Sequence, residues 1–176
     1  MESAHIEAPL FDFLSECGIA TQTYRHAPVF TVAEAKAVRA ADPGLHKGGH
    51  AKSLFVRDKK KRRALVMIGE DTRVDLKSLA PQIGLGRLSF GSAESLKKML
   101  GVVPGSVTPF ALVNARENAG SGEPLVVALD NQLMRHSMVF FHPLHNAATT
   151  AITPEGLRAF IKACGYTPIE LNLSQS

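Results

Sequence analysis

The sequence has few cysteines, and it has no hydrophobic run long enough to cross a membrane. Its two cysteines, Cys17 and Cys164, each lie near the end of an expected helix, and neither has a second ligand at metal-site spacing. We therefore interpret both as buried or partly buried free thiols. No stretch approaches 18 apolar residues, and no apolar segment of signal-peptide length begins the chain, so we expect a cytoplasmic protein.

Several motifs of catalytic and cofactor sites are also missing. The histidine pairs His46/His50 and His142/His145 are interrupted by glycine or proline, and no cysteine or carboxylate completes a zinc pattern. Gly84–Gly86 begins like a dinucleotide loop, but a strand, not a helix, is expected to follow it. Neither a P-loop nor a G-x-S-x-G nucleophile motif occurs. We expect no metal and no cofactor.

The composition is that of a folded domain with a moderate excess of positive charge. With 176 residues, of which 45% are hydrophobic, the chain can bury a core, and its length favours one domain over residues 1–176. The net charge of +4 fits a nucleic-acid partner without requiring one.

Capping signals predict where several helices begin. Thr31 and Glu34 match the capping box T-x-x-E, Ser92 is a favoured cap, and Thr153 precedes a proline suited to the first helical position. With the apolar spacing, these signals predict helices over residues 6–17, 31–40, 74–83, 92–100 and 153–164.

Short apolar runs predict the strands. Ala51–Val56 and Ala64–Ile68 flank the charged segment Arg57–Arg63, which indicates a hairpin with an exposed turn. Other strands are expected over residues 21–24, 88–90, 110–113, 125–129, 138–141 and 148–152. Because several strands follow one another without helices between them, we predict an α/β fold of the α+β type. Its sheet should be mixed, mainly antiparallel and surrounded by helices.

Two separated segments carry the candidate chemistry. Lys52 opens an apolar strand, where lysine is uncommon; it is either an exposed strand residue or a cation aimed into a cleft. The loop Gly101–Pro109 is fixed by glycine and proline and presents main-chain N–H groups with little obstruction. Together they suggest a site for an anionic or carbonyl-bearing ligand.

The turn between the two hairpin strands is strongly basic. It is either a solvated loop or a contact for nucleic-acid phosphates, which basic side chains bind without sequence preference. The candidate nucleic-acid-binding residues are Arg57, Lys59, Lys60, Lys61, Arg62 and Arg63.

Three ordered motifs, spread over most of the chain, resemble a known family. They are H-x-K-S-L-F-V-R-D-K-K from His50, G-x-x-P-G-S-V-T-P-F-A-L from Gly101, and F-H-P-L-x-N-x-x-T-x-x-I-T-x-x-x-L from Phe141. The combination is similar to the YbaK/prolyl-tRNA synthetase-associated editing domains, and most similar to their free-standing branch called ProX, PrdX or ProXp-ala.

The resemblance implies a trans-editing hydrolase that cleaves the ester between a mischarged amino acid and the terminal ribose of tRNA. In this branch the substrate is alanine attached to the proline tRNA. The implied partner is the acceptor end of mischarged tRNA, with prolyl-tRNA synthetase or translation factors as transient partners and no membrane. Monomer and homodimer both stay open.

The resemblance also assigns roles to individual residues. The family's required lysine falls on Lys52, its G-x-x-x-P loop begins at Gly105, and the histidine of its third motif falls on His142; these are the expected catalytic residues. Many relatives have asparagine where this chain has Ser53, which puts a polar role of this position in doubt. The expected substrate-binding residues are Phe30, Thr31, Val32, Glu34, Ser53, Gly101, Pro104, Ser106, Val107, Thr108, Pro109 and Asn146.

An aminoacyl ester is already activated, so a positioned water and a stabilised oxyanion can supply most of the acceleration. Lys52 would hold the terminal phosphate or ribose, or assist the carbonyl, while N–H groups near Gly105 would face the oxyanion. No residue stands out as a general base, and the vicinal ribose hydroxyl is a candidate for orienting the water. We expect the pocket, walled by Phe30, Val32 and the Gly101–Pro109 loop, to accept alanine and exclude proline by size.

Two other functions remain open at this point. The basic turn would also serve a non-catalytic tRNA- or DNA-binding module, which binds in a salt-sensitive way without turnover. The third hypothesis is a general small-molecule hydrolase, which would not need the basic turn.

Overall fold

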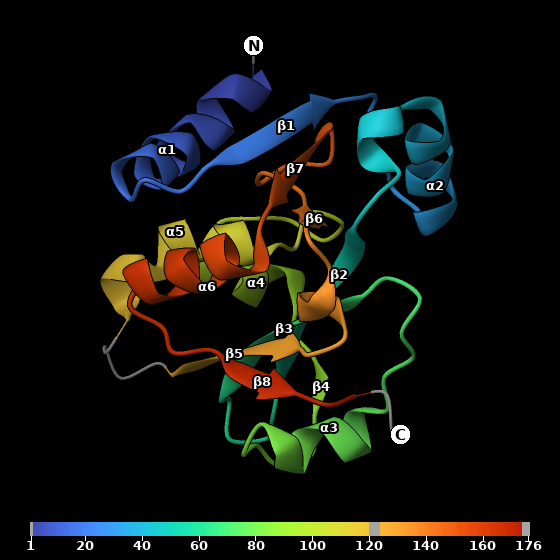
Figure 1. Ribbon diagram of the computed structural model, residues 1–176. Coiled ribbons are helices and arrows are strands. Elements are labelled where there is room, and N and C mark those ends of the chain that lie inside the picture. Colours follow the sequence, from blue (N-terminus) through green and yellow to red (C-terminus); the bar gives the residue numbers. More distant parts are fainter. Residues whose placement is uncertain (1, 120–123, 174–176) are drawn as a thin grey trace.

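A mixed sheet forms the centre of the computed structural model, which describes residues 2–119 and 124–173 (Figure 1). The strands follow the order β1-β7-β6-β2-β3-β5-β8, and β4 also pairs with β2. Four pairings are antiparallel (β1–β7, β6–β7, β2–β3 and β2–β4), and three are parallel (β2–β6, β3–β5 and β5–β8), in the part of the chain described. The strand bounds are β1 Thr21–Arg25, β2 Gly49–Arg57, β3 Arg63–Gly69, β4 Ser89–Phe90, β5 Leu125–Asp130, β6 Val139–Phe141, β7 Ala148–Ile152 and β8 Ile169–Leu171. The predicted mixed α/β architecture is confirmed.

Side-chain caps begin most of the helices. The Thr31 hydroxyl accepts from the Glu34 N–H as the capping box predicts, and Ser92 and Thr153 cap the helices that follow them. Asp75 caps another helix by accepting from two main-chain N–H groups. The helix bounds are α1 Glu2–Glu16, α2 Val32–Ala41, α3 Leu76–Gln82, α4 Ala93–Leu100, α5 Leu112–Ala115 and α6 Pro154–Ala163.

The hairpin of β2 and β3 lies in the middle of the sheet, as predicted from the two apolar runs. Its antiparallel register places Ala51 opposite Gly69 and Lys52 opposite Ile68. On its other edge β2 pairs, among the described strands, at its two ends alone, with β6 over Gly49–His50 and with β4 over Val56–Arg57. The middle of β2 therefore has an open edge.

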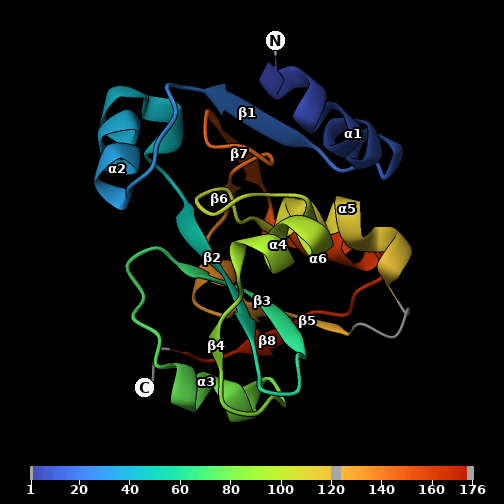
Figure 2. The same ribbon diagram turned by 180° about the vertical axis from the view of Figure 1, so that it is seen from behind.

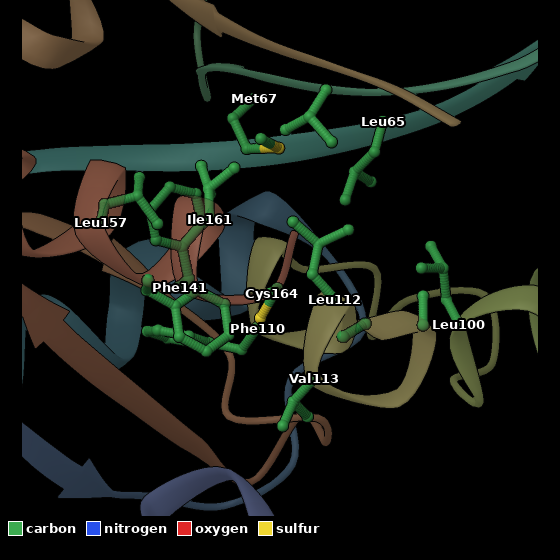
Figure 3. Close-up of a cluster of buried hydrophobic side chains, with 14 of the residues drawn as sticks. Leu65, Met67, Leu100, Phe110, Leu112, Val113, Phe141, Leu157, Ile161 and Cys164 are labelled. Atoms are coloured by element: carbon green, nitrogen blue, oxygen red, sulfur yellow. The ribbon is translucent and has the colours of Figure 1, made fainter. Parts of the chain in front are cut away.

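The sheet buries a hydrophobic core on each face of this hairpin. Leu65 and Met67 of β3 pack toward α6 and the segment around Phe110, as Figure 3 shows. Side chains at the alternate positions, such as Val66 and Ile68, pack against α3 on the opposite face. The position of α3 apart from the other helices is visible in both ribbon views (Figures 1 and 2).

The strand predicted over residues 110–113 is wrong. Pro109–Ala111 is a 3-10 turn that leads directly into α5, and Thr108 caps it by accepting from the Phe110 N–H. All four residues from Phe110 to Val113 are buried. A continuously buried apolar run has no polar positions to reveal its period, so the pattern does not separate a strand from a helix.

Three further differences concern the ends of the chain and the thiols. The first helix begins at Glu2, four residues earlier than the spacing predicts, and β8 was not predicted. Cys164 is buried as expected, but Cys17 is exposed because it follows the last turn of α1. Among the described residues, no helix combines the length and the apolar character needed to cross a membrane.

Candidate functional site

A cleft of about 220 Å³ lies where the start of α2, the open edge of β2, the turn after α4 and the end of β6 meet. It brings together segments that are far apart in the sequence, among them those carrying Lys52, Gly105 and His142. The lining residues are Val29, Phe30, Thr31, Val32, Ala51, Lys52, Ser53, Glu70, Gly105, Val107 and His142.

The open edge of β2 presents main-chain groups to this cleft. The Gly49 N–H donates to the carbonyl oxygen of Met138, directly before β6, and Phe55 O accepts from the Gly91 N–H; both bonds lie on the edge away from β3. Because main-chain groups alternate along a strand, Ala51 and Ser53 face the same edge. The Ser53 hydroxyl is also buried and has no hydrogen-bond partner within residues 2–119 and 124–173. This stretch of strand is therefore equipped to bind a polar ligand.

Lys52 is the cation of the cleft that is not neutralised by a direct contact. It makes no hydrogen bond or ion pair with any residue that the structure describes. Lys36 lowers the pKa of Asp71 most, and the charges of Arg39 and then Lys52 make smaller contributions. The half-buried side chain is consistent with the packed stem expected for this lysine.

The loop after α4 forms a tight turn that leaves two N–H groups free. Ser106 N–H donates to Val103 O, with Pro104 and Gly105 as the central residues of the turn. Gly105 has a φ of 89°, which suits the third position of a type II turn and disfavours any residue with a side chain. The N–H groups of Gly105 and Val107 have no partner among the described residues, whereas that of Ser106 is used.

His142 is held in one tautomer by the main chain. Its Nδ1 lies 2.9 Å from the Ala148 carbonyl oxygen, which can only accept, so Nδ1 carries the proton and Nε2 keeps a lone pair. Burial lowers the pKa of His142 against the opposing effect of this hydrogen bond. The ring is therefore a neutral acceptor at neutral pH.

The wall formed by Val29, Phe30 and Thr31 is fixed from two sides. Glu34 accepts from the N–H groups of Phe30 (2.6 Å) and Thr31 (3.0 Å), and these bonds lower the pKa of Glu34. Asn146 makes two hydrogen bonds with Val29. Its main-chain oxygen accepts from the Val29 N–H at 3.0 Å, and its side-chain amide donates to the Val29 carbonyl oxygen at 2.9 Å. Glu34 and Asn146 thus position the cleft without lining it.

Glu70, which the sequence reasoning did not single out, lines the cleft directly after β3. Its carboxylate binds Arg39 of α2 through two hydrogen bonds of 2.6 and 2.7 Å, and both side chains are mostly buried. The hairpin register was the available signal, because it places residue 70 beside the start of β2. The pair ties α2 to the sheet.

Several residues expected in the substrate site lie outside the cleft. Gly101 ends α4 in the left-handed conformation, Pro104 shapes the turn, and Ser106, Thr108 and Pro109 are buried. They support the loop that carries Gly105 and Val107. The roles assigned to these residues from the sequence stay predictions.

The basic turn does not reach the cleft. It lies at the end of the β2–β3 hairpin near α3, while α2 lies toward the other end (Figures 1 and 2). Contrary to the expectation of an exposed turn, Asp58 is buried, because it binds Arg62 and accepts from the N–H groups of Arg62 and Gly86. Arg63 binds Ser95, whereas Lys59–Lys61 are exposed. Their role in nucleic-acid binding stays a prediction.

No group of three or more histidine, cysteine or acidic side chains is placed to hold a metal ion within the described ranges. The polar groups of the cleft that have no partner among the described residues are Lys52, the Ser53 hydroxyl, main-chain N–H and C=O groups, and the Nε2 atom of His142.

The comparisons with known proteins agree on one family. The model of the aminoacyl-tRNA editing domain matches residues 26–160. A human protein named putative prolyl-tRNA synthetase associated domain-containing protein 1 is 35% identical, with 98% of this chain and 99% of the human one covered. The prolyl-tRNA editing protein ProX of Acetoanaerobium sticklandii is also 35% identical, over 88% and 89%.

Solved structures show the same fold at lower identity. A crystal structure of a putative trans-editing enzyme for prolyl tRNA synthetase superimposes with a TM-score of 0.68 at 22% identity, covering 95% of this chain and 96% of the other. The family model covers the three segments with Lys52, Gly105 and His142, which the fold gathers around one cleft. The chain belongs to the aminoacyl-tRNA editing domain family.

Proposed function

We propose that this protein is a trans-editing deacylase, which hydrolyses the ester between a mischarged amino acid and the terminal ribose of tRNA. The observation that carries the proposal is the cleft itself, where a lysine and main-chain N–H groups that have no partner among the described residues meet a neutral histidine. These are the groups that ester hydrolysis needs, and the two relatives at 35% identity are named for prolyl-tRNA synthetase association and prolyl-tRNA editing.

In this proposal the N–H groups of Gly105 and Val107 stabilise the oxyanion that forms when water attacks the ester carbonyl. Donors fixed by a tight turn need no reorganisation as the charge develops, which makes such stabilisation effective. Lys52 adds a positive charge to the same cleft, where it holds the terminal phosphate or assists the carbonyl.

His142 orders the attacking water or the vicinal ribose hydroxyl through Nε2. Because Nδ1–H donates to Ala148, the ring presents a lone pair at Nε2. The lowered pKa keeps this nitrogen unprotonated at neutral pH, which a hydrogen-bond acceptor or general base requires. An aminoacyl ester is reactive enough that one weak base suffices.

The substrate we propose is alanyl-tRNA for proline, with the correct prolyl ester excluded by size. Val32, Val107 and the turn at Gly105 line a cleft that is small for a whole nucleotide but sufficient for an ester with a small side chain. Exclusion of a larger residue by steric clash can exceed the 1–3 kcal/mol, roughly, that a missing methylene costs in a pocket.

The test is release of alanine from alanylated proline tRNA by the purified protein, with Lys52→Ala as the variant and Lys162→Ala as the matched control. Lys52 makes no hydrogen bond or ion pair with a described residue, so we expect the variant to fold and to lose most of its activity. Lys162 is an exposed lysine of α6 outside the cleft, and its replacement should leave deacylation unchanged.

Prolyl-tRNA should survive at enzyme concentrations that remove alanine completely. Equal hydrolysis of both esters would refute the size exclusion, and wild-type activity in Lys52→Ala would refute the assigned role of the lysine. Salt-sensitive tRNA binding without any alanine release would instead favour a non-catalytic binding module.

A further inference from the structure

Phe30 is an aromatic side chain that lines the cleft but remains mostly in solvent. Its exposed fraction is 76%, the largest among the exposed large hydrophobic residues described. Val32, the first residue of α2, is 45% exposed beside the same cleft. Large exposed apolar side chains at a cleft mark a surface that is covered when a ligand binds. The sequence predicts Phe30 as a wall of the amino-acid pocket, and the high exposure of the ring favours an additional contact with a group that lies outside the cleft.

The main chain that carries this ring is held by hydrogen bonds on both sides. Phe30 N–H donates to Glu34, and the preceding residue Val29 is held by Asn146 from the β6–β7 connection. These hydrogen bonds fix the main chain on which the exposed ring is carried, so little main-chain conformational entropy is lost when a ligand covers the ring.

The part of the substrate that suits an exposed flat ring is a nucleobase. If the ester lies in the cleft near Lys52 and Gly105, the next group along the substrate is the terminal ribose with its base, outside the cleft. Every nucleobase offers a flat face, and stacking of single-stranded bases on aromatic side chains is a general mode of nucleic-acid binding. The positive charge of Lys52 in the same cleft suits the adjoining phosphate.

We propose that Phe30 is the platform on which the terminal adenine of the tRNA stacks, while the ester enters the cleft. This inference rests on the proposed function, because it assumes that the aminoacyl end of tRNA is the ligand. It assigns Phe30 to binding of the nucleotide and leaves selection of the amino acid to the inner walls of the cleft.

The absence of tryptophan from the chain makes a direct test possible. In the variant Phe30→Trp the new residue is the only tryptophan, and its fluorescence reports on stacking at this position. We expect saturable quenching by the uncharged trinucleotide CCA, and little quenching by a trinucleotide of the same length whose last nucleotide lacks its base.

The matched control is Phe90→Trp. Phe90 is 63% exposed on β4, outside the cleft and next to Ser89, which pairs with Arg57 of the basic turn. The trinucleotide should leave its fluorescence unchanged. Quenching at position 90 but not at position 30, or equal responses to both trinucleotides at position 30, would overturn the inference.

Kinetics with alanylated minihelices provide the second test. Phe30→Ala should lower kcat/KM about 5- to 150-fold, which corresponds to the roughly 1–3 kcal/mol of one stacked base, whereas Phe30→Tyr and Phe90→Ala should stay near wild type. With a minihelix that lacks the terminal base, wild type and Phe30→Ala should become equal. A persistent difference on that substrate would show that Phe30 acts on another group, and would also overturn the inference.

The two tests separate this inference from the proposed function. Fluorescence with uncharged CCA requires binding but no hydrolysis, so quenching in the absence of deacylation would support the base platform and refute the enzyme. Deacylation by the wild type without any response at position 30 would leave the enzyme intact and refute the platform.

Discussion

At the scale of single residues, His142 shows how one main-chain contact sets the chemistry of a side chain. The Ala148 carbonyl oxygen accepts a hydrogen bond from Nδ1–H, which leaves Nε2 as the acceptor of the ring. In asparagine, the side-chain NH₂ can take the place of Nδ1–H, but nothing takes the place of Nε2. The substitution His142→Asn therefore separates the structural contact from the proposed catalytic one.

We expect His142→Asn to fold normally and to lose about 10²- to 10⁴-fold in kcat, the range of general acid–base contributions. In wild type, kcat should fall on the acid side as His142 becomes protonated. Because burial lowers the pKa of His142, this decrease should lie below pH 6.5, and the variant should lack it. His46→Asn, at an exposed histidine, is the control. If kcat of His142→Asn still fell at acid pH as it does in wild type, His142 would not be the acceptor or general base of the reaction.

The two cysteines differ sharply in their surroundings. Burial raises the pKa of the Cys164 thiol to about 12, whereas Cys17 is exposed. Since the thiolate is the reactive form, a thiol reagent such as DTNB should label one cysteine per native chain at pH 8 and two in denaturant. Cys17→Ser should abolish the native reaction. Rapid labelling of two thiols in the folded protein would contradict the burial of Cys164.

At the scale of elements, α2 is a helix without a buried residue. Its attachment depends on the capping box at its start and on ion pairs that Lys36 and Arg39 make with Asp71 and Glu70. Such a helix gains little from the hydrophobic core, so changes at its cap should be local.

We expect Thr31→Ala to weaken the start of α2 by about 0.5–2 kcal/mol, with hydrogen exchange accelerated in α2 but not in β3. The Glu34 carboxylate provides an internal pH test. The N–H groups of Phe30 and Thr31 lower its pKa, so the cap is complete above the ordinary glutamate pKa and is lost as the pH falls through the lowered value.

The amide resonances of Phe30 and Thr31 should therefore titrate with a midpoint below 4.5, the ordinary value for glutamate. Glu34→Gln should remove the titration while keeping an acceptor at the same place. Uniform acceleration of exchange over the whole sheet in Thr31→Ala would show that α2 does not open independently.

Elements with a polar start signal were predictable, and continuously buried ones were not. Thr31, Ser92 and Thr153 locate three helix starts because a hydroxyl satisfies free N–H groups at one defined position. The run Phe110–Val113 is buried throughout, so it has no alternation of polar and apolar residues that would indicate a helix or a strand. Strand β8 is three residues long and buries only Leu171, which is too short a pattern to predict a strand.

The candidate site was predictable where a residue type is unusual for its place. Lys52 in an apolar strand and the glycine and proline of the turn gave such signals, and the cleft contains both segments. Glu70 and the exposure of Phe30 depend on tertiary placement, since a charged residue after a strand and an aromatic before a helix are ordinary in sequence. The supporting role of Asn146 likewise arises only from its contact with Val29.

At the scale of the whole molecule, a polar cluster around the buried Glu7 connects α1 to the chain between His142 and β7. Glu7 of α1 binds Arg25 at the end of β1 and His145 at 2.6 Å. The Ala147 N–H donates to His145 Nδ1, so the Nε2–H of the ring donates to Glu7. The cluster thereby joins α1, β1 and the chain between His142 and β7.

Replacing Glu7 with Gln should lower the free energy of unfolding by about 1–3 kcal/mol at pH 7, because the partners of a buried acceptor lose part of their hydrogen bonding. Burial raises the pKa of Glu7, but the hydrogen bonds from Arg25 and His145 outweigh it and hold the pKa below its ordinary value. The contribution of Glu7 is therefore complete above pH 4.5 and is lost as the pH falls through the lowered folded-state pKa.

Urea midpoints measured from pH 7 to pH 3 should show the difference between wild type and Glu7→Gln shrinking toward acid. Glu16→Gln, an exposed position at the end of the same helix, should match wild type throughout. A difference that stays constant over this range would mean that the charge of Glu7 is not what stabilises the fold.

The pairing of β1 with β7 has a consequence for how the protein is made. Thr21 lies opposite Ile152, so β1 gains this partner only after most of the chain has been synthesised. Chains emerge from the ribosome N-terminus first, and contacts between distant segments form late. The hydrogen bonds between Asn146 and Val29 also form only after residue 146 has been synthesised. A nascent or prematurely terminated chain that lacks β7 should therefore be unable to act on any ligand, and activity should appear only with nearly complete synthesis.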